Sequence, residues 1–522
     1  MNMSSSPTLE SLPFDILFQI AAYLDIRDYM HLSHSSRSIF SSMENTIIAR
    51  ATNTMLHSKE GQAAWATQTG YYQAIKHRFN VHEAVATASP YSVSVLAYAA
   101  DFLYHQGFLC YRVKDQIHML DVHNSGQKER VLNLSHVIPR IIETEANHSN
   151  VGEQITLLYI SDGILVLLIN KVNLHEALLV GFDLQPRPDQ ARQRHLLLQE
   201  PVSSSDPIFV RHTRLYIWFG TFTAVNGRQS AWVLRGMNFN TLQRTEFSVE
   251  FLVDGELGKR VCFEIYQGHL YVVSIIDQQE SSFYHWSCYS PDHENNLGNG
   301  RLWRREHREG PIHEMWADLS IQVDEEKGRP VILECRREWL DGGSENHRTY
   351  YTTPLPTPDE ALAMHTKEFT RPTDMADSGE AHSQLPGKRL VRDYHAEHEI
   401  SRPLDQRFDF IPAYTRHSSH HLAAATYVDP KLQVDGVRSQ HRLRLRTKSR
   451  GCSCTIDEGG MEHFDSRGVC LWPSEDAPSE LLALLCPDSS TSLVRAVCDE
   501  RSLIYCTSAE GLPPPTPPIT IC

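Results

Sequence analysis

Four residues near the C-terminus combine the side chains that bind zinc. The thiols of Cys452, Cys454 and Cys470 and the imidazole of His463 lie within about 20 residues. Structural zinc sites usually place two to four residues between paired cysteines, whereas a single residue separates Cys452 from Cys454. We therefore expect unligated thiols in or near strands, with no metal and no cofactor.

Motifs that mark catalytic centres are missing from the sequence. It contains no phosphate-binding Gly-x-x-x-x-Gly-Lys-Ser/Thr loop and no Gly-x-Ser-x-Gly turn. The His-Glu pairs at 82–83, 175–176 and 313–314 are not followed by the second histidine of a zinc protease. The sequence thus predicts a non-catalytic protein.

Arginines with a period of two form the best candidate for a recognition surface. Arg442, Arg444 and Arg446 alternate with leucines, so one face of a strand would carry all three guanidinium groups. Arginine binds phosphate and carboxylate groups through paired N–H donors. These arginines are candidates for substrate binding, and a solvated strand face is the alternative.

The composition excludes several classes of protein. The chain has 522 residues, and 49 Lys and Arg against 64 Asp and Glu give a formal net charge of −15. This acidic surplus argues against general nucleic-acid binding, which depends on neutralising phosphates. With 41% apolar residues, the composition is that of a globular protein of several domains.

The longest apolar run covers residues 164–169, far short of the roughly 18 residues of a membrane-spanning helix. The first residues lack the basic and apolar regions of a secretory signal. We therefore expect no membrane association, mostly reduced thiols among the 11 cysteines, and a location in the cytoplasm, the nucleus or both.

A repeated phrase organises the middle of the chain, residues 91–353. A turn residue, a spacer and a strand beginning with leucine recur, and the leucines are Leu109, Leu165, Leu215 and Leu270. Their spacings of 56, 50 and 55 residues match a propeller blade of about four short strands. We expect six or seven blades, with a β-sandwich or barrel as the alternative.

Three further segments complete this domain. Residues 354–389 lack periodicity and are rich in Pro, Thr, Asp, Glu and Ser, which predicts a disordered insertion. Strand-like texture resumes within 390–510 and would close the propeller. Residues 511–522 would form an extended, proline-rich tail.

The N-terminal segment 9–45 predicts three short helices, and 46–90 a helical linker. The first helix begins near Pro13 and carries apolar side chains over an arc of roughly 220°, about twice what one core-facing side needs. So short a bundle cannot bury this surface alone. Either a second protein covers it, or the helix packs on the following helical zone.

This segment resembles an F-box. The residues that carry the resemblance are Leu12, Pro13, Ile16, Leu17, Ile20, Tyr23, Leu24, Asp28, Leu32, Ser36, Arg37 and Phe40. Tyr29 stands where the family usually has leucine, and Phe40 where tryptophan or leucine is common. The layout of the whole chain is similar to that of large fungal F-box proteins with a β-rich C-terminal domain.

The resemblance implies a helical module that docks onto the Skp-type adaptor of a cullin-based SCF ubiquitin ligase. The anchors that it implies are Leu12, Pro13, Ile16, Leu17, Ile20, Leu24, Leu32 and Phe40. We therefore expect an α+β multidomain protein that serves as the substrate-recognition subunit and holds an unknown protein substrate through its β-domain. The alternatives are an F-box protein with a non-ligase role, and a propeller enzyme or ligand-binding module.

Overall fold

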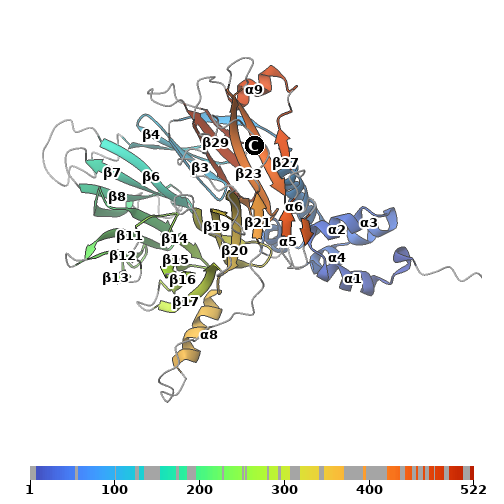
Figure 1. Ribbon diagram of the computed structural model, residues 1–522, viewed down its shortest axis with the longest axis horizontal. Coiled ribbons are helices and arrows are strands. Elements are labelled where there is room, and N and C mark those ends of the chain that lie inside the picture. Colours follow the sequence, from blue (N-terminus) through green and yellow to red (C-terminus); the bar gives the residue numbers. More distant parts are fainter. Residues whose placement is uncertain are drawn as a thin grey trace, which may run out of the picture.

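The computed structural model shows an N-terminal group of helices beside a domain built almost entirely of strands (Figure 1). The residues that it describes are 8–52, 57–99, 101–123, 129–134, 153–171, 176–184, 196–225, 229–249, 252, 255–278, 281–291, 296–305, 318–339, 346–369, 392–395, 420–434, 441–449, 454–456, 462–464, 469–474, 476–486, 493–508 and 518–521.

The helical module follows a short 3-10 helix, Leu9–Ser11. Its helices are α1 (Phe14–Tyr23), α2 (Ile26–Ser33), α3 (Arg37–Met43), α4 (Thr46–Ala51), α5 (Lys59–Thr67) and α6 (Tyr71–Ala86). Short polar side chains start several of them. Asp25 accepts the backbone N–H of Asp28 at 2.7 Å, and Ser58 accepts that of Gly61 at 3.0 Å. Each such cap satisfies a backbone donor that has no partner within its helix.

One hydrophobic core runs through this module. It joins Leu17, Ala21, Met30 and Ile39 of α1–α3 to Ile48, Tyr72 and Ile75 of α4–α6. The first three helices therefore pack on the helices that follow. Packing within the chain therefore accounts for the middle of the wide apolar arc of α1.

Seven antiparallel sheets of four strands each make up the described β-domain. The first sheet contains β2 (Phe102–His105), β3 (Phe108–Val113), β4 (Gln116–Asp121) and β5 (Arg130–Asn133). The second contains β6 (Glu153–Ser161), β7 (Ile164–Lys171), β8 (Glu176–Asp183) and β9 (Leu196–Ser203). The third contains β10 (Ile208–His212), β11 (Tyr216–Val225), β12 (Gln229–Asn238) and β13 (Arg244–Val249).

The fourth sheet contains β14 (Val261–Tyr266), β15 (His269–Gln278), β16 (Ser281–Tyr289) and β17 (Asn296–Arg305). The fifth contains β18 (Asp318–Asp324), β19 (Arg329–Trp339), β20 (Asn346–Pro354) and β21 (Arg392–His395). The sixth contains β22 (His420–His421), β23 (Thr426–Val434), β24 (His441–Ser449) and β27 (Val469–Trp472). The seventh contains β1 (Ser94–Tyr98), β28 (Leu493–Cys498), β29 (Leu503–Ser508) and β30 (Pro518–Ile521). A small hairpin, β25 (Cys454–Ile456) with β26 (Glu462–Phe464), and helix α9 (Ser479–Leu485) complete this part.

These sheets are the blades of a β-propeller. The first strand of one blade contacts the first strand of the next, as in the series β2, β6, β10, β14 and β18. Apolar side chains fill the space between blades, and Val166 of β7, for example, shares a cluster with Val210 of β10. The expected propeller is confirmed, and seven sheets lie within the expected six or seven blades.

The repeated phrase is the turn between the first and second strands of a blade. Gln106-Gly107, Asp162-Gly163 and Gln267-Gly268 all have positive φ at both positions, which is the backbone of a two-residue hairpin turn. Leu109, Leu165 and Leu270 are fully buried in the strands that follow. Leu215 does not fit the phrase, because it lies in a longer loop between His212 and Ile217 and is 56% exposed.

The ring is closed by the last residues of the chain. Strand β30 pairs with β29 on one side and with β1, from near the beginning of the domain, on the other. Ile519 is fully buried there. The expectation of an extended tail over 511–522 is therefore wrong for 518–521, where an apolar Ile-Thr-Ile run completes a sheet. Residues 511–517 lie outside the described part.

The segment 354–389 contains a helix, α8 (Pro358–Phe369), and both Leu355 before it and Ala361 within it are fully buried. The expectation of disorder is wrong for these residues, because α8 packs on β17 of the fourth blade. Its first turn carries Asp359 and Glu360, which favour a helix start. Residues 370–389 lie outside the described part.

None of the described helices is both long enough and apolar enough to cross a membrane.

Candidate functional site

The edges of the apolar arc on α1 remain at the surface. Leu17 and Ala21, in the middle of the arc, are 3% and 0% exposed. Ile16 and Tyr23 lie toward one edge at 40% and 91%, while Phe14 and Phe18 lie toward the other edge. Phe40 of α3 is also exposed, with its ring against the edge of Tyr72. We call Phe14, Ile16, Phe18, Tyr23 and Phe40 the N-terminal apolar surface.

The eight anchors implied by the F-box resemblance divide into two groups. Pro13, Ile16 and Phe40 are exposed and Ile20 is half-buried. Leu12, Leu24 and Leu32 pack partly buried against the helical core, and Leu17 lies inside it. Leu17 is therefore a core residue of this chain, which is a correction to its expected role. Phe14 and Phe18 are exposed although the resemblance assigned them no role.

The arginine run lies on β24, the third strand of the sixth blade. Arg442, Arg444 and Arg446 are half-buried and alternate with Leu443, which is 4% exposed. Asp429 and Lys431 of β23 are the register partners of Arg446 and Arg444. The expected alternation of the two faces is confirmed, while the proposed substrate contact stays a prediction.

The zinc candidates lie on different strands, as far as the structure describes them. Cys454 is on β25, His463 on β26 and Cys470 on β27, and Cys452 lies outside the described residues. Among the described residues, no group of three or more His, Cys, Asp and Glu is arranged to hold a metal ion. The seven other cysteines that the structure describes, from Cys110 to Cys506, are buried or half-buried.

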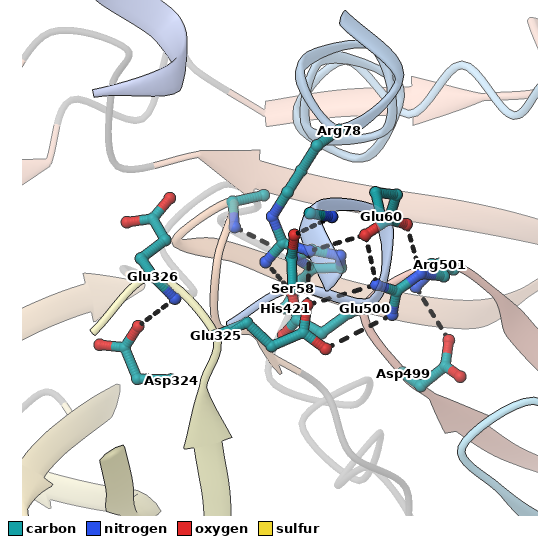
Figure 2. A network of polar contacts seen from close by, with 12 residues as sticks. Ser58, Glu60, Arg78, Asp324, Glu325, Glu326, His421, Asp499, Glu500 and Arg501 are labelled. Atoms are coloured by element: carbon teal, nitrogen blue, oxygen red, sulfur yellow. Dashed lines mark hydrogen bonds and ion pairs between the residues drawn. The ribbon is translucent and has the colours of Figure 1, made fainter. Parts of the chain in front are cut away.

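A second feature, unpredicted from the sequence, joins the helices to the propeller. Arg501, in the β28–β29 turn, binds Glu60 of α5 through two parallel contacts of 2.6 Å. Arg78 of α6 binds Glu325, in the β18–β19 turn, at 2.6 Å. Glu500 lies 3.6 Å from Arg78 (Figure 2). We call Glu60, Arg78, Glu325, Glu500 and Arg501 the polar junction.

The polar junction is shielded from water. The side chain of Arg78 is 2% exposed, and those of Glu60 and Arg501 are 14% and 12% exposed. Burial alone would raise the pKa of Glu60, but the hydrogen bonds and charge of Arg501, with the charge of Arg78, bring it below its ordinary value. Glu60 therefore stays charged and paired with Arg501 at neutral pH.

Neighbouring contacts extend the polar junction over several blades. Lys59 donates to the carbonyl of Gln106 in the turn of the first blade at 3.0 Å. His57 lies so close to Gly328, in the β18–β19 turn, that a Cβ there would be 2.5 Å from its ring. Tyr104 of the first blade donates to Asp499 of the seventh at 2.6 Å. The start of α5 thus lies over turns of the first, fifth and seventh blades.

Two histidines lie where α6 meets the sixth blade. The rings of His82 and His421 meet edge to face at 5.9 Å, and His421 Nδ1 accepts the backbone N–H of Ala424 at 3.1 Å. Burial, together with the neighbouring His421 and Arg78, lowers the pKa of His82 to about 3. His82 is therefore neutral at physiological pH and adds no charge to the polar junction.

The polar junction fixes geometry and offers no reacting group. Its cations are each held by carboxylates of a different chain segment, 247 residues away for Arg78 and 441 residues away for Arg501. No local spacing links such residues, so sequence patterns could not predict the pairing. The arrangement holds the helical module in one orientation on the propeller.

Comparison with known proteins leaves the family open. No protein-family model and no curated protein matches this chain. Similar solved structures include the polysaccharide lyase Uly1, which is 9% identical with a TM-score of 0.33 over 82% of this chain and 90% of that one. Drosophila Semaphorin 2a is 10% identical with a TM-score of 0.32, over 78% and 72%. At these values, neither likeness says anything about function.

Proposed function

We propose that this chain is the substrate-recognition subunit of an SCF-type ubiquitin ligase. The observation that carries the proposal is the N-terminal apolar surface on helices whose sequence resembles an F-box. Partially exposed aromatic and aliphatic side chains on two neighbouring helices are what a partner that binds by helix-in-groove contacts requires. The partner would be the Skp-type adaptor, and through it a cullin.

The division of α1 supports this proposal on energetic grounds. Leu17 and Ala21 already hold α1 in the core, so the module folds without covering its edges. Burying Ile16, Tyr23 and Phe40 against a partner would then add roughly 1–3 kcal/mol for each well-packed anchor, since a few central side chains supply most of the affinity of an interface.

The polar junction supports the proposed role in a different way. In such a ligase the receptor does not react; it holds the substrate near an activated ubiquitin, and proximity raises the rate. A receptor with one fixed orientation between docking module and propeller would hold the substrate at a defined distance. The proposed location is intracellular, in the cytoplasm, the nucleus or both, where thiols are kept reduced.

The test is a pull-down from cell extract with the full chain, probing for the adaptor and the cullin. The variant Ile16→Ala/Tyr23→Ala/Phe40→Ala truncates three exposed side chains of the N-terminal apolar surface. The matched control is Val131→Ala/Leu215→Ala/Leu242→Ala, which truncates three propeller side chains that are 51–57% exposed. Circular dichroism checks that both variants fold.

We expect wild type and control to capture both subunits and the first variant to capture neither. Capture of the adaptor without the cullin by wild type would replace the ligase role with a non-ligase F-box complex. A folded wild type that captures neither subunit would overturn the proposal.

A further inference from the structure

Five polar side chains from neighbouring blades meet at the innermost strands of the propeller. They are His105 at the end of β2, Tyr159 on β6, Arg211 and His212 at the end of β10, and Glu264 on β14. We call them the axial cluster. Each lies on the first strand of its blade, and these strands surround the central channel of a propeller.

Contacts between blades place the axial cluster across the channel. The hydroxyl of Tyr159, from the second blade, lies 3.1 Å from His105 Nε2 of the first blade. The same hydroxyl donates to Glu264 of the fourth blade at 3.4 Å. Because the third blade stands between the second and the fourth, Tyr159 reaches Glu264 only past the inner edge of β10. The cluster therefore lies at the axis of the ring.

The internal bonds of the axial cluster leave donors open. Both oxygens of Glu264 are used, by Tyr159 and a backbone N–H on one side and by Arg211 Nε at 2.9 Å on the other. Arg211 Nη1 donates to the carbonyl of Val210, and Nη2 has no partner among the described residues. The Arg211 side chain is 25% exposed although it stands on an innermost strand, so part of it is open to solvent.

Two imidazoles flank this guanidinium. His212 is 2% exposed, stands edge to face against Tyr159, and both of its ring nitrogens lack a hydrogen-bond partner in the described part of the chain. A buried polar group without a partner costs free energy that a ligand can recover. Burial lowers the pKa values of His105 and His212, the latter to about 3, so both are neutral.

We propose that the axial cluster is a binding site for a carboxylate group, with Arg211 Nη2 as its principal donor and the N–H of neutral His212 as a flanking donor, while the N–H of His105 is used by the Tyr159 oxygen. Glu264 is a positioning residue that holds Arg211 and Tyr159. The open N–H groups of Arg211 and His212 are donors, which favours a ligand that accepts hydrogen bonds. Glu264 already balances Arg211, so the site tolerates one added negative charge better than the two of a phosphate.

The direction of access follows from the helical module. His105 and His212 end their strands, and the turn after His105 receives Lys59 at the start of α5. That end of the channel is therefore the one that faces the helices, and the ligand enters from the opposite face of the propeller. The proposal depends on the channel alone and not on the proposed docking to an adaptor.

The test is ligand-observed saturation-transfer NMR on the full chain, with titration to a dissociation constant. The probes are propionate as a free organic acid, N-acetylglycine as the end of a polypeptide, N-acetylglycinamide as its uncharged match, and inorganic phosphate. Arg211→Lys keeps a cation beside Glu264 but removes the Nη2 donor. His212→Phe keeps a ring against Tyr159. Arg235→Lys, in an outer pair with Glu246, is the matched control.

We expect saturable binding of at least one carboxylate, with binding weakened roughly tenfold or more by Arg211→Lys and less by His212→Phe. Arg235→Lys and the triple variant of the N-terminal apolar surface should leave it unchanged, so a failed adaptor pull-down would not affect this result. Propionate and N-acetylglycine separate a free acid from a chain end. Absence of saturable carboxylate binding, equal binding by a folded Arg211→Lys, or tighter binding of the amide or of phosphate would overturn the proposal.

Discussion

The helical module and the propeller differ in how much of their apolar surface they leave exposed. Among the described residues, eight of the sixteen large apolar side chains at the surface lie between Leu9 and Trp65, and the other eight are scattered from Tyr91 to Leu471. A ring of sheets pairs its strands and buries both faces of each blade. The helices bury one side and leave aromatic and aliphatic groups in water. The propeller therefore covers most of its apolar side chains within its own fold, whereas the helical module has a surface suited to a partner.

Truncation after Pro517 is the change expected to damage the propeller most. It removes β30, which pairs with both β1 and β29 and contributes the fully buried Ile519. We expect loss of the cooperative urea transition, because the ring then has two open edges and the total stability of a domain is only about 5–15 kcal/mol. Ile519→Val, the matched control, should cost about 1 kcal/mol. An unchanged urea midpoint after truncation would contradict the closure by β30.

Arg501→Met tests the polar junction between the two regions. It leaves the carboxylate of Glu60 buried without its main cation and removes the second cation of Glu325, so we expect a loss of about 3–5 kcal/mol in the free energy of unfolding, measured by urea denaturation. Arg235→Met is the matched control, because it breaks an outer ion pair in which Arg235 Nε lies 2.7 Å from Glu246; it should cost at most about 1 kcal/mol. Equal losses in the two variants would mean that the polar junction contributes no more than a surface pair.

Glu326, in the β18–β19 turn beside the polar junction, provides a pH test. Burial and the charge of Asp324 raise the pKa of Glu326 to about 7. The folded state then keeps a proton that the unfolded chain releases near pH 4.5, so this contribution to stability is complete below that pH and is lost as the pH rises through about 7. Glu326→Gln should therefore be more stable than wild type at pH 8, by about 2 kcal/mol, and similar at pH 4.5. A difference that does not change with pH would contradict the raised pKa.

Local signals were enough to predict the propeller. Gln106-Gly107 and its two counterparts need positive φ, and they are followed by a leucine that the blade buries. The phrase fails at Leu215, where a longer loop shifts the frame by two residues, so that Ile217 is the buried residue instead. β30 was missed because the prolines before it suggested a tail, and its pairing partner β1 lies more than 400 residues away.

The candidate site shows a similar limit. The wide apolar arc of α1 was visible in the sequence, but which of its residues face the core depends on where α4 and α6 lie. Ile16 and Leu17 are neighbours in the chain and equally apolar, yet one is 40% and the other 3% exposed. The polar junction and the axial cluster join residues of distant blades, which only the closed ring brings together.

That neighbouring pair gives the most direct test of the central claim. Ile16→Ala and Leu17→Ala are compared by affinity for the purified Skp-type adaptor and by the free energy of unfolding. We predict that Ile16→Ala weakens adaptor binding roughly tenfold with a change in stability below about 1 kcal/mol, whereas Leu17→Ala costs about 2–5 kcal/mol in stability and leaves the affinity of the folded protein unchanged. A folded Ile16→Ala variant that binds the adaptor like wild type, or a wild type that does not bind it, would contradict the account.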